Sequence, residues 1–147
     1  MTEKKQYSTF FLDGLFFGVP VEKVQEVLRF HEMTRVPLAP PVVTGLINLR
    51  GQIVTALDLR RRLLLRDRAT ADRPMNIVIR TAGGAVSLLV DEIGDVVEVE
   101  EESFELPPDT LAASSRELIE GVYKLNDRLM HVLDTEKVVN DAAGSRA

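Results

Sequence analysis

The sequence predicts a mainly β protein built from two small closed barrels, one in each half of the chain. Three observations support this prediction: short apolar runs, turn residues between them, and an internal repeat. The 147 residues are 45% hydrophobic and 28% charged, a composition that suits one folded domain of ordinary size. Closure into barrels is expected because it hides the unpaired edges of short strands.

Most apolar runs have the length of a strand and end at Gly, Pro, Asn or Asp. The expected strands are Phe10–Leu12, Phe16–Val19, Leu46–Leu49, Ile53–Leu57, Ile77–Ile79, Ala85–Val90 and Leu129–Leu133. The pairs Asp13-Gly14 and Gly83-Gly84 separate neighbouring runs, and glycine can adopt the positive φ of a tight hairpin turn. The sequence therefore predicts a hairpin at each of these two places.

Helices are expected to be few and short. The segment Val21–Phe30 carries apolar residues at helical spacing, which predicts a short helix there. Leu59–Leu65 and Thr135–Asn140 each follow an aspartate, Asp58 or Asp134. A carboxylate at that place accepts hydrogen bonds from the free amide groups of the first turn, so both segments are predicted to be capped helices.

An internal repeat relates the two halves. Residues 45–58 align with residues 121–134 at a constant offset of 76, and residues 19–27 align with residues 88–96 at an offset of 69. Each half then has the order hairpin, short helix, proline-containing loop, hairpin, short helix. The expected boundaries are 7–66 for the first barrel half, 75–140 for the second barrel half and 141–147 for a flexible tail.

The composition argues against several classes of function. The chain has no cysteine, which rules out disulfides, thiolate zinc sites and a cysteine nucleophile. Only two histidines are present and no Walker or dinucleotide-binding loop occurs. We therefore predict that the protein binds no metal or cofactor and is not an enzyme. The net charge of −5 argues against nucleic acid or an anionic membrane as the main partner. No apolar run approaches the ~18 residues of a membrane helix.

His131 is the strongest candidate for a catalytic base. It alternates with Leu129 and Leu133 on one strand face, and its repeat equivalent is Thr55. This pattern favours a buried, hydrogen-bonded histidine over a base. A small hydrolase that uses His131 with Asp134 stays open as an alternative, although no nucleophile accompanies the pair.

A basic run lies at residues 60–62, and Arg66 and Arg68 follow it. Leucines on one face of the predicted helix leave these arginines outward, so a solvated helix face is expected. The alternative is a nucleic-acid-binding double barrel that uses these arginines together with Arg50. The chain offers little for base stacking, since it has no Trp and only two Tyr.

Arg50 departs from the repeat. Its equivalent is Asn126, and Gly51 is equivalent to Asp127, so the second half has an ordinary Asn-Asp turn. Nothing in the fold requires an arginine at this hairpin tip. Arg50 is expected either to be a solvated turn residue or to meet a carboxylate within the protein or on a partner.

Four stretches carry a resemblance to known proteins, and they are Pro20–Val27, Gly45–Arg60, Val90–Val96 and Gly121–Val138. The second contains the block Asn48-Leu49-Arg50-Gly51. In this order the stretches resemble the CheW family of bacterial chemotaxis coupling proteins. The match covers residues 7–140, so residues 1–147 are interpreted as a single CheW-like domain and a stand-alone coupling protein.

The resemblance implies a fold, a location and partners. It implies two SH3-like five-stranded barrels, which agrees with the repeat. It also implies a non-catalytic cytoplasmic adaptor, monomeric on its own, without membrane insertion. Such an adaptor binds the cytoplasmic tip of a methyl-accepting chemotaxis receptor and the regulatory domain of the histidine kinase CheA. The two CheW-like partners alternate in rings under the receptor array.

The resemblance also implies binding residues. The positions associated with receptor contact are Val24, Glu26, Gly45, Arg50 and Val96, and Ile93 is our choice for the kinase contact. The residues alone favour the core for Val24. Ser87 stands where the family usually has a glycine, so its contribution to the receptor surface is an open question. An apolar helix face in a groove between barrels would suit this role.

Overall fold

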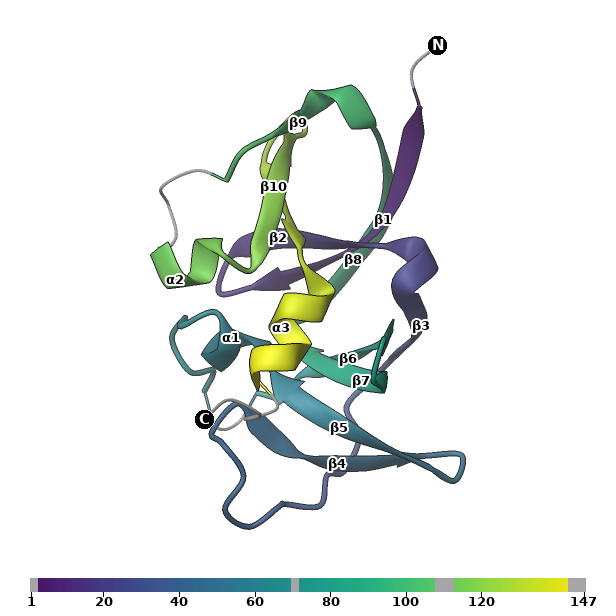
Figure 1. Cartoon of the computed structure of the whole chain (residues 1–147), viewed down its shortest axis with the longest axis vertical. Coiled ribbons are helices and arrows are strands. Elements are labelled where there is room, and N and C mark those ends of the chain that lie inside the picture. Colours follow the sequence, from purple (N-terminus) through teal and green to yellow (C-terminus); the bar gives the residue numbers. More distant parts are fainter. Residues whose placement is uncertain (1–2, 70–71, 108–112, 143–147) are drawn as a thin grey trace.

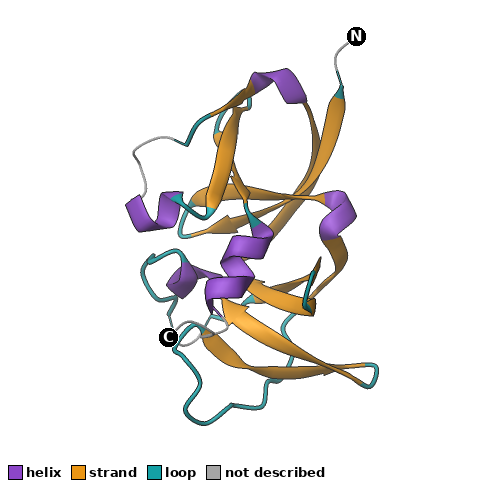
Figure 2. Ribbon diagram, in the orientation of Figure 1, coloured by secondary structure: helices purple, strands orange, loops and turns teal. Residues whose placement is uncertain are grey.

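The computed structural model describes residues 3–69, 72–107 and 113–142, and the strands of these segments form two sheets (Figures 1 and 2). Across sheet A the order is β8 (Glu92–Glu100), β1 (Lys4–Leu12), β2 (Leu15–Pro20), β11 (Leu129–Leu133), β10 (Ile119–Lys124) and β9 (Phe104–Glu105). Across sheet B it is β3 (Val24–Leu28), β6 (Met75–Thr81), β7 (Gly84–Val90), β5 (Gln52–Asp58) and β4 (Val43–Leu49). The predicted mainly β architecture is confirmed, as are the hairpins at Asp13-Gly14 and around Gly83.

Each sheet combines strands from both halves of the chain. β2 pairs in parallel with β11, where Phe17 lies opposite His131, and β5 pairs in parallel with β7. The opening hairpin of each half therefore completes the sheet of the other half, so residues 7–66 and 75–140 are not separate barrels. The repeat could not reveal this exchange, because it reports the order of elements along the chain and both opening hairpins have similar apolar patterns.

The repeat is nevertheless visible in space. Equivalent strands take equivalent places, since sheet A runs β8, β1, β2, β11, β10 and sheet B runs β3, β6, β7, β5, β4. Both closing hairpins carry a bulge at the same position, just before Gly45 in β4 and just before Gly121 in β10. The sixth strand of sheet A is the two-residue β9. Its place in sheet B is taken by a single bridge between Thr34 and Leu46.

Strand pairing does not close either sheet within the described segments, contrary to the expected closed barrels. The order of each sheet is open, with β8 and β9 at the edges of sheet A and β3 and β4 at the edges of sheet B. The sheets are SH3-like, with five strands in sheet B and six in sheet A. The exposed edge of β8 carries Glu92, Asp95, Glu98 and Glu100, and such charges discourage further strand pairing.

Three apolar clusters fill the interior. The largest lies between the sheets and contains side chains of both, among them Phe10, Phe17, Ile77 and Leu88. A second cluster lies inside sheet A around Tyr123. A third lies inside sheet B and consists of Ile47, Leu49, Val54 and Val78, with Leu28, Met33 and Ala85 packed against it. Strands such as β6 are therefore buried on both faces, which explains their nearly continuous apolar sequences.

The short helices agree only partly with the sequence predictions. The predicted helix at Val21–Phe30 is wrong. A single 3-10 turn, η1 (Val21–Lys23), is followed directly by β3, because the β-branched valines of this segment suit a strand that pairs with β6. A second 3-10 turn, η2 (Glu101–Ser103), follows β8, and the unpredicted helix α2 (Ala113–Arg116) precedes β10.

The two predicted aspartate caps are confirmed. Asp58 accepts hydrogen bonds from the amides of Arg60 and Arg61 at the start of α1 (Leu59–Arg62). Asp134 accepts one from the amide of Lys137 at the start of α3 (Thr135–Ala142). The expected tail at 141–147 is wrong at its beginning, because α3 continues through residue 142; residues 143–147 lie outside the described residues.

Arg60 of α1 and Arg68 of the following segment join the sheets, contrary to the expected solvated helix face, whereas Arg61 and Arg66 are 46% and 83% exposed as expected. Arg60 donates hydrogen bonds to Asp91 at 3.0, 3.2 and 2.6 Å, and it lies 3.8 Å from Asp13. Arg68 donates to Asp91 at 3.1 Å and to Asp58 at 3.4 Å. The side chains of Arg60 and Arg68 are only 13% and 10% exposed. The alignment of leucines on one helix face gave no sign of Asp13 and Asp91, which come from turns distant in the sequence.

The first turns of α1 and α3 make equivalent contacts. Arg60 of α1 reaches the turn between β1 and β2, where Asp13 lies. At the equivalent repeat position in α3, Glu136 accepts a hydrogen bond of 3.2 Å from the amide of Ala82, in the turn between β6 and β7. Each sheet's opening hairpin is thus held by a helix that follows the closing hairpin of the other sheet.

The carboxylates of this network have lowered pKa values. Partial burial by itself would raise the pKa of Asp91, but hydrogen bonds from Arg60, the Asp13 amide and Arg68 outweigh it, so the net shift is downward. A hydrogen bond from Arg66 lowers the pKa of Asp13. Both groups therefore take up protons at lower pH in the folded chain than in the unfolded chain.

We expect this difference to make stability depend on acid pH. Since the folded pKa lies below the ordinary value of 3.8, the contribution of Asp91 is complete at neutral pH and is lost as the pH falls below that value. Urea unfolding at pH 7, 5 and 3.5 should show little change over the first step and a fall over the second. The fall should be smaller in Asp91→Asn; an equal fall in both proteins would contradict the assignment.

Candidate functional site

The two edges of sheet B meet at an exposed ion pair. Glu26 lies on edge strand β3, and Arg50 lies at the turn between β4 and β5, next to the opposite edge. The Arg50 guanidinium donates a hydrogen bond to the Glu26 carboxylate. The Arg50 side chain is 71% exposed and that of Glu26 is 20% exposed. The curl of the sheet thus brings together two of the predicted receptor-binding residues, and it presents the arginine to solvent.

Arg50 occupies a strained turn. Its φ is 50° and that of Gly51 is 89°, which places both central residues of the hairpin turn in the left-handed region. The Asn48 side chain accepts a hydrogen bond of 2.9 Å from the amide of Gly51 and supports the turn. A non-glycine residue in this region costs roughly 1–2 kcal/mol. Such strain is typical of functional positions.

Gly45 is buried and allows a close crossing of two segments. A Cβ atom at this position would lie 2.6 Å from the Thr34 carbonyl oxygen and 3.1 Å from the Met33 Cβ. Thr34 and Leu46 exchange two backbone hydrogen bonds of 2.8 Å at the same place. Gly121, its repeat equivalent, is crowded in the same way by β9. The absence of a side chain at Gly45 therefore allows Met33 and Thr34 to pack closely against β4 at the edge of sheet B.

The remaining predicted residues lie in different surroundings. Val24 pairs with Ile79 and packs against the cluster between the sheets, as the residues alone suggested. Val96 is 57% exposed on β8 of sheet A, and Ile93, on the same strand, packs against the cluster between the sheets. Ser87 is fully buried in sheet B. Of the predicted binding residues, Glu26 and Arg50 are therefore in direct contact through their ion pair. Val96 lies on the other sheet, where it presents an exposed apolar side chain.

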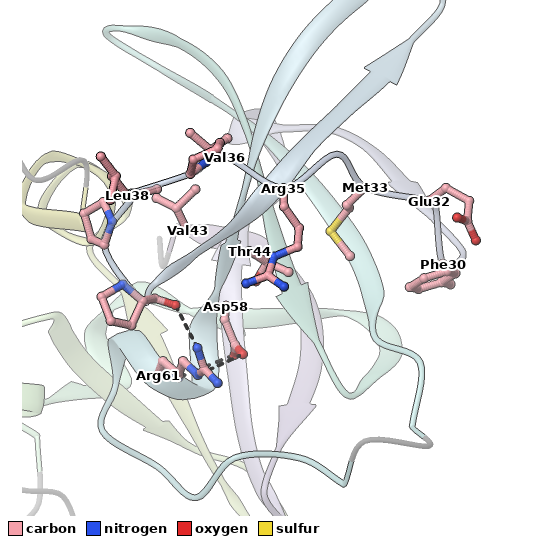
Figure 3. Close-up of a pocket in the computed structure, with 14 residues that line it drawn as sticks. Phe30, Glu32, Met33, Arg35, Val36, Leu38, Val43, Thr44, Asp58 and Arg61 are labelled. Atoms are coloured by element: carbon pink, nitrogen blue, oxygen red, sulfur yellow. Dashed lines mark hydrogen bonds and ion pairs between the residues drawn. The ribbon is translucent and has the colours of Figure 1, made fainter.

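A cavity of about 730 Å³ lies beneath the segment that joins β3 to β4 (Figure 3). Arg35 points into it, and at its end Arg61 donates a hydrogen bond of 3.1 Å to the Pro41 carbonyl. On its rim Leu38 is fully exposed and has a φ of 66°. Sequence reasoning noted this segment only as a proline loop. The signal for a projecting side chain was a leucine held between prolines, Pro37 on one side and Pro40 on the other.

The structure gives little support to a catalytic site. His131 is only 3% exposed, and its Nδ1 donates a hydrogen bond of 2.8 Å to the Phe16 carbonyl. Asp134 is engaged as the cap of α3. Within residues 3–69, 72–107 and 113–142, no group of three or more His, Cys, Asp or Glu side chains is placed to hold a metal ion. In those same segments no helix is long and apolar enough to cross a membrane.

The basic surface needed for nucleic acid is also largely neutralised. Arg60 and Arg68 are bound to aspartates, Arg61 pairs with Asp67 at 3.1 Å, and Arg66 pairs with Asp13 at 2.7 Å. The double-barrel alternative would have to break these ion pairs before phosphate could bind. Its other arginine, Arg50, is held by Glu26.

Comparison with known proteins identifies the family of this chain. A family model described as the CheW-like domain matches residues 6–143. The chain belongs to the CheW family. Two CheW-family relatives named Chemotaxis protein CheW match over nearly their whole length. That of Bacillus subtilis is 30% identical over 138 residues, covering 94% of this chain and 88% of the relative. That of Klebsiella aerogenes is 27% identical over 139 residues, covering 95% and 84%.

The CheW fold is also found in a solved structure. The crystal structure of the scaffolding protein TtCheW from Thermoanaerobacter tengcongensis superimposes with a TM-score of 0.83 at 26% sequence identity. The superposition covers 95% of this chain and 94% of TtCheW. The resemblance seen in the order of the four stretches is confirmed, and it extends over the exchanged hairpins as well as the signature block around Arg50.

Proposed function

We propose that this CheW-family chain is a non-catalytic adaptor that couples the cytoplasmic tips of chemoreceptors to the regulatory domain of the histidine kinase CheA. Membership of a family with chemotaxis and scaffolding members supports the proposal. The observation that carries it is the exposed Arg50 in a strained turn, bound to Glu26 at the meeting point of the edges of sheet B. It would work in the cytoplasm, as a monomer when free, without nucleic acid or membrane insertion.

The receptor contact is proposed to lie on the edge of sheet B. Arg50 and Glu26 offer paired charges there, and such pairs fix the register of a bound helix more than they add affinity. Gly45 and Val24 support the edge from inside, by close packing and by burial. Val96 adds an exposed apolar side chain on sheet A. The kinase contact is proposed for the region of Ile93, on the same strand.

Arg50→Glu is expected to weaken binding to a receptor hairpin by about tenfold, as loss of a charged contact at an interface does. The variant should stay folded, because an exposed ion pair contributes at most about 1 kcal/mol. The measurement is titration calorimetry with a chemoreceptor cytoplasmic hairpin and, separately, a CheA regulatory domain encoded in the same genome.

Arg128→Glu is the matched control, because it reverses a partly exposed arginine at the turn of β10 and β11 in the other sheet. It should leave the receptor affinity unchanged. The exchange Glu26→Arg/Arg50→Glu should restore the ion pair but not the affinity, since the partner would meet the charges in the wrong places. If Arg50→Glu bound the receptor hairpin as tightly as the parent protein, the proposed receptor site would be wrong.

A further inference from the structure

Two polar side chains are buried together inside sheet B. Asn76 of β6 and Ser87 of β7 are both 0% exposed. The Ser87 hydroxyl donates a hydrogen bond of 2.7 Å to the Asn76 side-chain oxygen. By strand alternation both point to the same side as Val78, which belongs to the apolar cluster inside this sheet. The pair therefore sits where apolar side chains would be expected.

The side-chain amide nitrogen of Asn76 binds the backbone where β3 ends. It donates a hydrogen bond of 3.0 Å to the carbonyl oxygen of Arg29, the residue after the last residue of β3. Because the Arg29 carbonyl can only accept, the amide nitrogen faces it, and the amide oxygen is left to accept from the Ser87 hydroxyl. Ser87 thus holds the Asn76 amide at its oxygen, while its nitrogen binds Arg29.

This contact is one end of a short bridge between the edges of sheet B. Residues 29–34 leave β3 at Arg29 and reach β4 at Thr34, which is bonded to Leu46. Met33 packs against the cluster inside the sheet on the way. The Glu26–Arg50 ion pair joins the same two edges. The position of the Arg29 carbonyl therefore helps to set where Glu26 lies relative to Arg50.

An apolar pair would serve stability at least as well as Asn76 and Ser87. Replacing both partners of a buried hydrogen bond by apolar groups of similar shape is nearly neutral or stabilising, whereas removing one of them leaves the other unsatisfied. The polar pair is best explained by the position that it imposes on the end of β3.

We infer that Ser87 and Asn76 are positioning residues for the partner-binding edge of this protein. They hold the Arg29 carbonyl and thereby fix the geometry of Glu26 and Arg50 for an incoming receptor helix. The inference rests on the proposed receptor site. It also gives buried Ser87 a role in binding without any contact to the partner.

The test compares stability with binding in three variants. Ser87→Ala is expected to lower the midpoint of thermal unfolding and to weaken receptor-hairpin binding about fivefold, which corresponds to one ordinary hydrogen bond. Ser87→Ala/Asn76→Leu should recover the midpoint but not the affinity. Ser115→Ala is the matched control, because it removes another buried hydroxyl. That hydroxyl donates a hydrogen bond of 2.6 Å to the Leu63 carbonyl in a different part of the fold. It should lower the midpoint and leave the affinity unchanged.

Three results would overturn the inference. They are an unchanged affinity in Ser87→Ala, recovery of affinity together with stability in the double variant, and an equal loss of affinity in Ser115→Ala. If the parent protein bound no receptor hairpin, the proposed function would fail and amide exchange would decide the inference alone. The Thr34 amide, bonded to Leu46, should then exchange faster in Ser87→Ala than in Ser115→Ala, and equal exchange rates would count against the positioning role.

Discussion

Asp91→Asn is expected to lower the free energy of unfolding by about 3 kcal/mol. Removing one charge from a largely buried network leaves its partners unbalanced, and Asp91 is the carboxylate that both Arg60 and Arg68 share. It also accepts a hydrogen bond of 2.8 Å from the Asp13 amide, in the turn of the first hairpin. The loss therefore loosens α1, the segment after it and the opening hairpin of sheet A together. Urea unfolding at neutral pH measures the change.

Asp67→Asn is the control for this prediction. Asp67 also pairs with an arginine, Arg61, but its side chain is 64% exposed, and exposed pairs contribute about 0–1 kcal/mol. A similar small loss in both variants would mean that the network around Asp91 is solvated in solution. A large loss in Asp91→Asn alone would establish it as the link between the two sheets.

Gly45→Ala is expected to cost about 2 kcal/mol, in the range of overpacking at a site that cannot relax. The added methyl group would meet a backbone oxygen at 2.6 Å, and a backbone atom cannot turn aside as a flexible side chain can. To make room, the segment at Met33 and Thr34 must move away from β4. We expect weaker Thr34–Leu46 hydrogen bonds, seen as faster amide exchange at these residues, and weaker receptor binding that follows from the displaced edge.

Gly83→Ala is the matched control, since a Cβ there would meet only the Thr81 hydroxyl, at 4.0 Å. Its unfolding free energy should stay within about 0.5 kcal/mol of the parent protein. If Gly45→Ala were equally harmless, the close crossing of the two segments would not exist in solution. If it weakened receptor binding at unchanged stability and exchange, Gly45 would contact the partner directly.

Local features of the fold were predictable from the sequence because their causes are local. A tight turn needs a residue with positive φ, which glycine supplies, and an aspartate directly before a helix can cap that helix. The hairpin at Asp13-Gly14 and the starts of α1 and α3 therefore follow from a few neighbouring residues. The segment Val21–Phe30 shows the limit of this reasoning. Its apolar spacing fits a helix, but pairing with β6 and the preference of valine for strands decide otherwise.

The candidate site was predictable where the repeat is broken. Arg50 could be found because its equivalent is an ordinary turn residue, Asn126, and a deviation from the repeat needs its own reason. The other features depend on contacts between distant segments. The crossing that requires Gly45, the carboxylates around Arg60 and the bond from Asn76 to Arg29 all join residues that no local pattern connects.

The exchange of opening hairpins has a consequence for synthesis on the ribosome. Phe17 in β2 finds its neighbour in β11 only when position 131 has been made, and at roughly 5–20 residues per second the chain between them takes about 6–23 s to synthesise. Sheet B has all five of its strands once Val90 has emerged, so it can assemble first. During that interval the apolar side chains of the hairpin around Phe10 and Phe17 lack the strands that complete their sheet. This hairpin is therefore the segment of the nascent chain most in need of a chaperone.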